Sequence, residues 1–506
     1  MDKQPLDLVP EICLLAGALI TLLSGSFLPR QRQWIARTIA VTALAGSAAT
    51  STYALIGPAH TIYAHTYAVD VTTGAVRLIV AAATLLVIGL GVDELAGSHR
   101  ESETYALLLL SALGTVVMAG ASDLLVLAVA FLLASVPLYA LIGLARTGAA
   151  AEAVMKAYLL GALTNILLLG GVALLHALAA GTTYADLAQN LRGAPRAVLA
   201  TAVVGVLAGL LFKSGAAPVH FWVPDAAQGS SVTAASFLTT VPKVGALAAA
   251  YRLLDALPGP GADAGLDRSL LVAVLAALSM TLGNLAAFRQ EDPRRLLGWS
   301  TVSQVGYLLL PVAVAGRSEA ALPSLLLYLA GYAVTNLGAF AVLAALPHRR
   351  TLASYRGLAR EHPVLAAALT VCLLSLVGTP PTAVFIGKLT TFTAAWDGGA
   401  TWLVVLAALN TVASLFYYLR WLGPVFRRDS PDPGEHDDQH QHQQGGGDRP
   451  HHSGHQPQGN GHQSQEEPVV PHPWARTTAV GAATAVLLVG LGAAPILAWQ
   501  DGLLLR

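Results

Sequence analysis

Charged side chains are scarce in this sequence. Only 11% of the 506 residues are Asp, Glu, Lys or Arg and 55% are hydrophobic, whereas charged residues make up about 25% of an ordinary soluble domain. A soluble globular protein is therefore excluded. The formal net charge is zero, so nothing in the composition indicates nucleic acid as a partner.

Cysteines and nucleotide-binding motifs are rare or missing as well. The two cysteines, Cys13 and Cys372, lie far apart in apolar segments, which excludes a Cys-ligated iron-sulfur cluster in this chain. No glycine-rich phosphate-binding pattern follows a strand-like run. We therefore expect no cofactor and no metal site in this chain. The start MDKQPLD lacks a charged signal region with a cleavage site, so we also expect no cleaved signal peptide.

Long apolar stretches recur along the whole chain. Each is long enough to cross a hydrocarbon core of about 30 Å, which predicts an all-α integral membrane protein of about fourteen transmembrane helices. The expected spans are 8–28, 38–57, 73–92, 105–120, 122–145, 157–180, 197–222, 232–254, 269–288, 296–316, 322–346, 363–395, 401–422 and 477–499.

The arginines predict an orientation. An even number of spans places both termini on one side, and the short loops after odd-numbered spans are rich in arginine. Because such loops stay in the cytoplasm, we expect both termini to lie outside a cell membrane. The loop arginines are Arg30, Arg32, Arg37, Arg146, Arg289, Arg294, Arg295, Arg349, Arg350, Arg356, Arg360, Arg420, Arg427 and Arg428, against Arg192, Arg196, Arg268 and Arg317 on the opposite side.

Two spans carry glycine and proline in their middle, at 213–218 and 378–381. Proline removes a backbone donor and clashes with the preceding turn, so we predict broken helices 7 and 12. Breaks five helices apart are typical of two inverted five-helix repeats, although glycine and proline are also tolerated in continuous membrane helices. The expected divisions are an N-terminal three-helix segment 1–104, repeats 105–255 and 256–428, a loop 429–473 and a final helix segment 474–506.

The loop 429–473 differs from the rest of the chain. It has almost no apolar residues to bury, so we expect a disordered cytoplasmic loop. It holds eight of the fifteen histidines, which can bind divalent metals loosely. A tolerated low-complexity insertion is the simpler interpretation.

Lysine is used only five times, and Lys213, Lys243 and Lys388 lie inside apolar spans, whereas Lys156 is expected at the cytoplasmic start of the sixth span. At 1.5 Å per residue from a turn at 223–231, Lys213 and Lys243 lie roughly 15 to 18 Å deep. A charge at that depth costs about 2.5–3.5 kcal/mol or more and normally marks a transport path. A desolvated lysine can release its proton, whereas arginine stays charged. We predict that these three lysines carry protons.

His220, beside the break in span seven, is the best candidate for a proton relay, because histidine titrates near neutral pH. His176, alone in its span, is interpreted as structural. The remaining polar side chains of the spans are equally explained by interhelical hydrogen bonds. They are Ser303, Gln304, Tyr307, Thr335 and Asn336.

Six strings resemble, in order and spacing, the antiporter-like subunits of proton-translocating NADH:quinone oxidoreductase: GLLFKSGAAPVHFWVPDAAQGS, TTVPKVGAL, STVSQVGYLLL, TNLGAFAV, SYRGLAREHP and LVGTPPTAVFIGKLTTF. SYRGLAREHP and LVPEICLLAGALITLL are most similar to the subunit N branch. The resemblance covers nearly all spans. It implies that the family's path lysines fall on Lys213, Lys243 and Lys388. It also implies other membrane-arm subunits as partners in the lipid bilayer, with NADH, FMN, iron-sulfur clusters and quinone bound by those partners.

Three positions depart from the family pattern. Leu132 replaces a glutamate that usually precedes Ser-x-Pro by three residues, Gln228 stands where Tyr-Glu usually precedes glycine, and Gln304 replaces a common histidine. No Asp or Glu occurs between Asp123 and Glu152, so this span offers Lys213 no acidic partner in its interior. Unless another helix or a partner subunit supplies a carboxylate, we expect weakened coupling.

The leading interpretation is a non-redox subunit of NADH:quinone oxidoreductase that translocates protons when its partners reduce quinone. A cation/proton antiporter-complex subunit and a structural membrane-arm paralogue with weakened coupling are the alternatives. Sodium-dependent transport by the chain alone would favour the antiporter. Copurification with NADH dehydrogenase activity would favour the other two.

The orientation gives a first testable prediction. A cysteine introduced into 429–473 should be protected from a membrane-impermeant thiol reagent in intact cells and should react after the membrane is opened, because arginine-rich loops stay inside. Labelling from the outside would reverse the predicted orientation.

Overall fold

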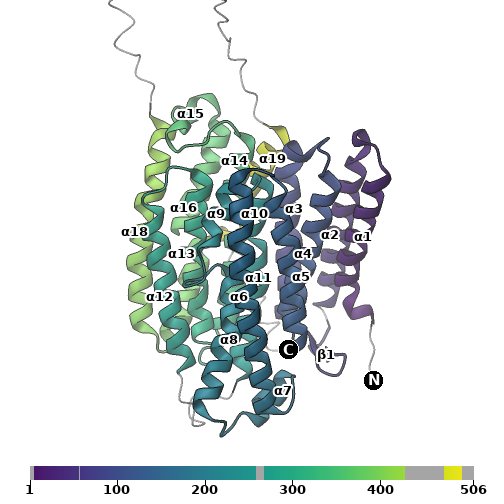
Figure 1. Ribbon diagram of the computed structural model, residues 1–506. Coiled ribbons are helices and arrows are strands. Elements are labelled where there is room, and N and C mark those ends of the chain that lie inside the picture. Colours follow the sequence, from purple (N-terminus) through teal and green to yellow (C-terminus); the bar gives the residue numbers. More distant parts are fainter. Residues whose placement is uncertain (1–4, 56, 258–266, 428–471, 493–506) are drawn as a thin grey trace, which may run out of the picture.

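The computed structural model describes residues 5–55, 57–257, 267–427 and 472–492 as a bundle of long, roughly parallel helices (Figure 1). The first half contains α1 (Val9–Phe27), α2 (Trp34–Ala54), α3 (Val71–Leu95), α4 (Glu101–Gly120), α5 (Leu124–Gly143), α6 (Gly148–Ala179), α7 (Tyr184–Asn190), α8 (Arg196–Ser214), α9 (Trp222–Gly229), α10 (Val232–Leu238) and α11 (Val241–Ala256). The second half contains α12 (Arg268–Ala287), α13 (Pro293–Ala313), α14 (Ala321–Ala345), α15 (Leu358–Glu361), α16 (Pro363–Val377), α17 (Ala383–Asp397), α18 (Thr401–Phe426) and α19 (Pro473–Leu491).

Minor elements complete the described chain. Three short 3-10 helices cover Pro5–Leu8, Arg30–Arg32 and Ala353–Tyr355. The strands β1 (His60–Ile62) and β2 (Tyr67–Val69) form an antiparallel hairpin in which Thr61 pairs with Ala68. The hairpin lies at one end of the bundle, and α15 lies at the opposite end (Figure 1).

The helix pattern confirms an all-α membrane protein. Twelve helical segments of the described residues are long and apolar enough to cross a membrane, and one of them runs from Val232 to Ala256 across α10 and α11. The two expected spans outside this set correspond to α2 and to the pair α16 and α17, so the total of fourteen stays a prediction. The loop 429–473 lies outside the described residues except for its last two positions.

Two boundaries differ from expectation. Helix α6 has 32 residues and begins at Gly148, so Lys156 lies inside the helix and does not open it as predicted. The segment 223–231, expected as a turn, forms most of the short helix α9. In both places the helix includes polar residues. Lys156 of α6 and Asp225 of α9 form an ion pair, which hydropathy alone does not reveal.

Both predicted breaks are present. Helix α8 is capped by Gly215 and α16 by Gly378, where φ is 83° and 95°, a conformation that glycine adopts without a steric penalty. In each break the glycine amide donates to the carbonyls three and four residues earlier, and the next amide donates to the carbonyl five residues earlier. This is a Schellman cap, which ends a helix while satisfying its last carbonyls. The likeness of the two breaks agrees with inverted repeats, which remain a prediction.

A third break was not predicted. The eighth span, expected to be continuous, is divided at Thr239 and Thr240 between α10 and α11. Pro242 stands in the first turn of α11, where its missing amide donor costs nothing. That proline was the sequence signal for the break, but no glycine marks the position.

In the described chain, the C-terminal helix α19 packs against both α3 and α14 and so joins the N-terminal helices to the second half. Helices α1 to α4 lie on one side of the bundle, at the right of Figure 1, and α12, α16 and α18 lie on the other side, at the left. Helices α5 to α11 lie between them. The three broken helices therefore lie in the middle and far part of the bundle, away from α1 and α2.

A buried ion pair fastens α1 to α3. The carboxylate of Glu11 accepts two hydrogen bonds from the Arg77 guanidinium, at 2.7 and 2.8 Å, and a third from the Tyr67 hydroxyl at 2.6 Å. The side chains of Arg77 and Glu11 are only 1% and 7% exposed. Breaking such a pair leaves an uncompensated buried charge, whereas replacing both partners by apolar groups removes the charges together.

This contact gives a second prediction. Glu11→Ala should destabilise the folded chain by about 3–5 kcal/mol, because it leaves Arg77 unpaired. The double variant Glu11→Leu/Arg77→Met should recover most of that loss. Thermal unfolding of the purified membrane complex measures both effects, and a double variant as unstable as Glu11→Ala would contradict the explanation.

Candidate functional site

Lys213 lies in the last turn of α8, at the predicted break. It is 1% exposed, its Nζ donates to Ser135 Oγ of α5 at 2.9 Å, and it lies 5.7 Å from the centre of the Phe131 ring. Within the described residues, no carboxylate forms an ion pair with Lys213. A neutral hydroxyl and an aromatic face are thus the groups that hold this amine.

The non-helical segment after Lys213 is held by its neighbours. The amide of Ala217 donates to Ser279 Oγ of α12 at 2.9 Å, and the Trp222 indole donates to the Phe212 carbonyl at 3.2 Å. His220 in this segment is 2% exposed, and its ring meets Trp299 of α13 edge to face at 5.4 Å. The Nδ1 atom of His220 has no hydrogen-bond partner. His220 therefore lies beside the break and against α13, and its role as a relay stays a prediction.

Lys243 lies in the first turn of α11, at the break that was not predicted. Its Nζ donates to the carbonyl of Thr239 and, at 3.4 Å, to that of Leu238. These are the carbonyls left without helical partners where α10 ends. The Tyr332 hydroxyl of α14 also donates to the Thr239 carbonyl, at 2.8 Å, and Asn336 donates to both threonine hydroxyls of the break.

Lys388 in α17 has the same kind of environment. Its Nζ donates to the carbonyls of Val377 at 2.9 Å and Leu376 at 3.3 Å, the last two residues of α16, and it lies 4.2 Å from the centre of the Tyr307 ring. A Cβ on Gly378 would stand 3.0 Å from the Lys388 Cδ, so a larger residue would press on this stem as well as strain the backbone at a φ of 95°. The lysine crosses the break and binds the end of the preceding half-helix.

One physical rule explains the partners of Lys243 and Lys388. The last carbonyls of a helix have no intrahelical donor and carry a partial negative charge of about half an electron. A helix broken inside the membrane would bury these carbonyls without water. Lys243 and Lys388 donate to such carbonyls, and Lys213 belongs to the terminal turn of α8 itself.

Polar side chains lie between the sites of Lys243 and Lys388 in two hydrogen-bonded groups. The Tyr332 hydroxyl lies 3.0 Å from Thr301 Oγ1 of α13, and one turn further along α13 Gln304 donates to the Leu376 carbonyl at 2.8 Å. Gln304 also accepts from the Tyr328 hydroxyl of α14 at 2.6 Å. Gln304 thus shares a carbonyl with Lys388, and this polar line runs between α13 and α14.

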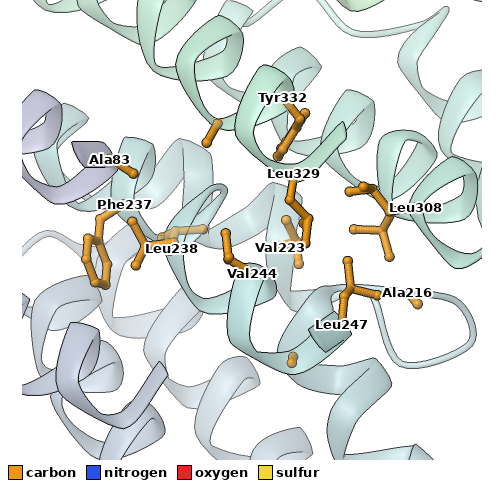
Figure 2. Close-up of a cluster of buried hydrophobic side chains, with 14 of the residues drawn as sticks. Ala83, Ala216, Val223, Phe237, Leu238, Val244, Leu247, Leu308, Leu329 and Tyr332 are labelled. Carbon is orange, nitrogen blue, oxygen red and sulfur yellow. The ribbon is translucent and has the colours of Figure 1, made fainter. Parts of the chain in front are cut away.

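Buried apolar side chains pack beside the break in α8. Figure 2 shows Ala216, Val223 of α9, Leu247 of α11 and Leu329 of α14 in one cluster with Tyr332. All of these residues are at most 1% exposed. The sequence-predicted residues are therefore not gathered at one point: Lys213 and His220 lie at one break, and Lys243 and Lys388 lie along the polar line.

An ion-pair cluster lies beside α9. Asp225 binds Lys156 at 2.7 Å and Arg295 at 2.6 Å, and Arg295 also donates to Gln228 at 3.0 Å. Although burial raises the pKa of Asp225, its hydrogen bonds to Lys156 and Arg295 hold that pKa below the ordinary value. Asp225 therefore stays charged at neutral pH. Gln228, one of the departures from the family pattern, completes this network through Arg295.

Ser303 and Thr335 make the interhelical hydrogen bonds by which the sequence explains them. Ser303 donates to Asn284 at 2.8 Å, and Thr335 lies 3.1 Å from Ser375 Oγ. Sequence reasoning missed Ser135, Thr239 and Tyr332, although the two threonines before Pro242 offered a signal for Thr239. No group of three or more His, Cys, Asp or Glu in the described part of the chain is placed to hold a metal ion.

Leu132 does not point toward Lys213. Its side chain is 41% exposed on the outer face of α5, whereas Phe131 and Ser135 on the inner face contact the lysine. We expected a carboxylate at position 132 to stand near Lys213. Residues three apart on a helix are neighbours, but here the side chain at 135 is the one that reaches the amine.

Comparison with known proteins identifies the family. Residues 121–414 match the family described as NADH:quinone oxidoreductase/Mrp antiporter, TM. The chain is 53% identical over 497 residues, and 98% of each sequence, to NADH-quinone oxidoreductase subunit N of Mycobacterium sp. (strain JLS). The chain belongs to the subunit N family of NADH-quinone oxidoreductases.

Solved structures agree with membership in the subunit N family. The chain is similar to one in respiratory complex I from Thermus thermophilus with bound aureothin, with 32% identity, a TM-score of 0.77, and coverage of 96% of this chain and 98% of that one. A chain of the Mrp complex from Dietzia sp. DQ12-45-1b has the same fold, with a TM-score of 0.79, 24% identity and coverage of 97% and 95%.

The contact of Lys213 with Ser135 gives a third prediction. Ser135→Asp should place a carboxylate beside the lysine and slow proton release at least about tenfold, because opposite charges about 4 Å apart attract by about 4 kcal/mol even at an effective dielectric of 20. Leu132→Glu, on the exposed face, should have the smaller effect. The proton-to-electron ratio of reconstituted complex measures both, and a larger effect at 132 would contradict the geometry.

Proposed function

We propose that this chain carries protons across the cell membrane as a non-redox, membrane-arm subunit of an NADH:quinone oxidoreductase. One observation carries the proposal. Each of three lysines buried in the bundle is held by neutral acceptors, Ser135 Oγ or the end carbonyls of a half-helix. Such partners stabilise an ammonium by partial charge only, so less free energy is needed to remove the proton than from a carboxylate pair.

The proposed path begins near Asp225 on the cytoplasmic side. Lys213 takes the proton with His220 as the neighbouring relay, and Lys243 receives it next. The hydroxyls of Tyr332 and Tyr328 hold the Thr239 carbonyl and Gln304 in place between Lys243 and Lys388. Because buried apolar side chains pack beside the α8 break, we propose that transfer from Lys213 to Lys243 requires that cluster to admit water.

Orientation is part of the proposal. The loops expected in the cytoplasm contact one another: Arg295 binds Asp225, Leu352 donates to the Glu291 carbonyl at 2.9 Å, and Arg420 donates to the Phe288 carbonyl. Loops that meet must lie on one side of the membrane. Because these loops are rich in arginine, we propose that this shared face lies in the cytoplasm and both termini outside.

By family membership, we propose that NADH, FMN, iron-sulfur clusters and quinone belong to partner subunits. Their reaction would drive this chain by changing the charge or the position of groups at its border. The coupled enzyme activity is then a property of the assembly, and this chain contributes the proton path.

A structural paralogue with weakened coupling is the second candidate. The observation that favours it is the environment of Lys213, which lacks a paired carboxylate among the described residues and has Leu132 pointing outward. In that case Lys243 and Lys388 would still exchange protons locally while the contribution of Lys213 is small.

The fourth prediction decides between these candidates. Lys213→Ala should assemble and retain NADH:quinone turnover with an uncoupler present, but lower the proton-to-electron ratio, since it removes a buried ionisable group at the α8 break. His176→Ala, which removes another titratable group from the same bundle, should leave the ratio unchanged. A wild-type ratio in assembled Lys213→Ala complex would favour the paralogue without coupling.

A further inference from the structure

Two neighbouring carboxylates at the end of α3 hold two different helices. Asp93 accepts from the amides of Trp474 and Ala475, at 2.9 and 3.0 Å, in the first turn of α19. Glu94 accepts from the amide of Val232 at 3.1 Å and from the amide and hydroxyl of Thr233 at 2.9 and 2.6 Å, in the first turn of α10. Two carboxylates adjacent in sequence therefore hold two different helices, and only α10, held by Glu94, contributes groups to the proposed path.

Helix α10 is short and fixed at both of its ends. It has seven residues, which is fewer than an isolated helix needs to be stable, so its position depends on its contacts. At its far end, about 10 Å along the axis, the Leu238 and Thr239 carbonyls bind Lys243. Non-helical residues precede and follow it, so a displacement of its first turn would be carried to those carbonyls.

Close packing holds the same first turn against α3. A Cβ on Gly91, one turn before Glu94, would stand 2.4 Å from the Thr233 Oγ1 atom. The hydroxyl of Thr233 therefore occupies the space that a side chain at position 91 would need, while the Glu94 carboxylate binds it from the next turn. Glu94 and Gly91 together set the position of α10 along its axis and its rotation about that axis.

We infer that Glu94 is a positioning residue for Lys243: by holding the first turn of α10, it sets where the carbonyls that bind the Lys243 amine stand. The inference rests on the proposed proton path through Lys243. Asp93 makes equivalent contacts with a helix that provides none of the polar groups of that path, so its carboxylate is the matched control.

The test uses the whole complex reconstituted in proteoliposomes, with assembly quantified and the proton-to-electron ratio measured beside uncoupled NADH:quinone turnover. Lys243→Ala sets the loss expected when this lysine is silent. Glu94→Ala should produce at least about half of that loss with turnover retained, Glu94→Gln a smaller one, and Asp93→Ala none. In a Lys243→Ala background, Glu94→Ala should add no further loss, since both act on one site.

Gly91→Ala is the second variant. It displaces α10 without changing a charge, and it should lower the ratio as Glu94→Ala does. If it does so, the effect is one of position and the inference stands even where Glu94→Ala fails to assemble.

Two results overturn the inference alone. They are a wild-type ratio in assembled Glu94→Ala when Lys243→Ala is impaired, and equal losses in Glu94→Ala and Asp93→Ala. A wild-type ratio in Lys243→Ala itself overturns the proposed role of that lysine, and with it the inference, so the two failures are distinguished.

Discussion

A broken membrane helix needs a donor for its last carbonyls, and a buried lysine needs an acceptor that does not fix its charge. In this chain the lysine supplies the donor and the helix-end carbonyl supplies the acceptor. An unpaired carbonyl buried without water costs about 1–3 kcal/mol, and a charged lysine near the bilayer centre costs about 2.5–3.5 kcal/mol or more. When Lys243 and Lys388 donate to the ends of α10 and α16, both costs fall together. The breaks, the tyrosines of α14 and the glycine at 378 are arranged around this pairing.

Much of the fold follows from sequence patterns. Apolar runs located the long helices, and Gly215 and Gly378, each followed by proline three residues later, marked the two breaks because their chemistry ends a helix locally. The break at Thr239 was missed although Pro242 offered a signal, because proline is also tolerated in continuous membrane helices and no glycine marks the position. Contacts from Lys243, Tyr332 and Asn336 stabilise the interruption.

The lysines themselves were identifiable from depth and rarity, but their partners were not. Ser135 and Leu132 are three residues apart on α5, and which of them faces Lys213 depends on the rotation of α5 against α8. Rotation is set by packing between helices, which hydropathy does not encode when both faces are apolar. The carbonyl partners were equally hidden, since every residue has a carbonyl and only the break makes one available.

The apolar cluster beside the α8 break has an electrical consequence for the proposed proton path. Val223, Leu247 and Leu329 are buried and have no group that can accept or pass on a proton. Figure 2 shows them in one cluster with Ala216 and Tyr332. If protons cross as proposed, a continuous chain of hydroxyls and amines would let them leak back whenever the enzyme paused. A dry cluster on that path would act as an insulator at rest and keep the gradient built by earlier turnovers.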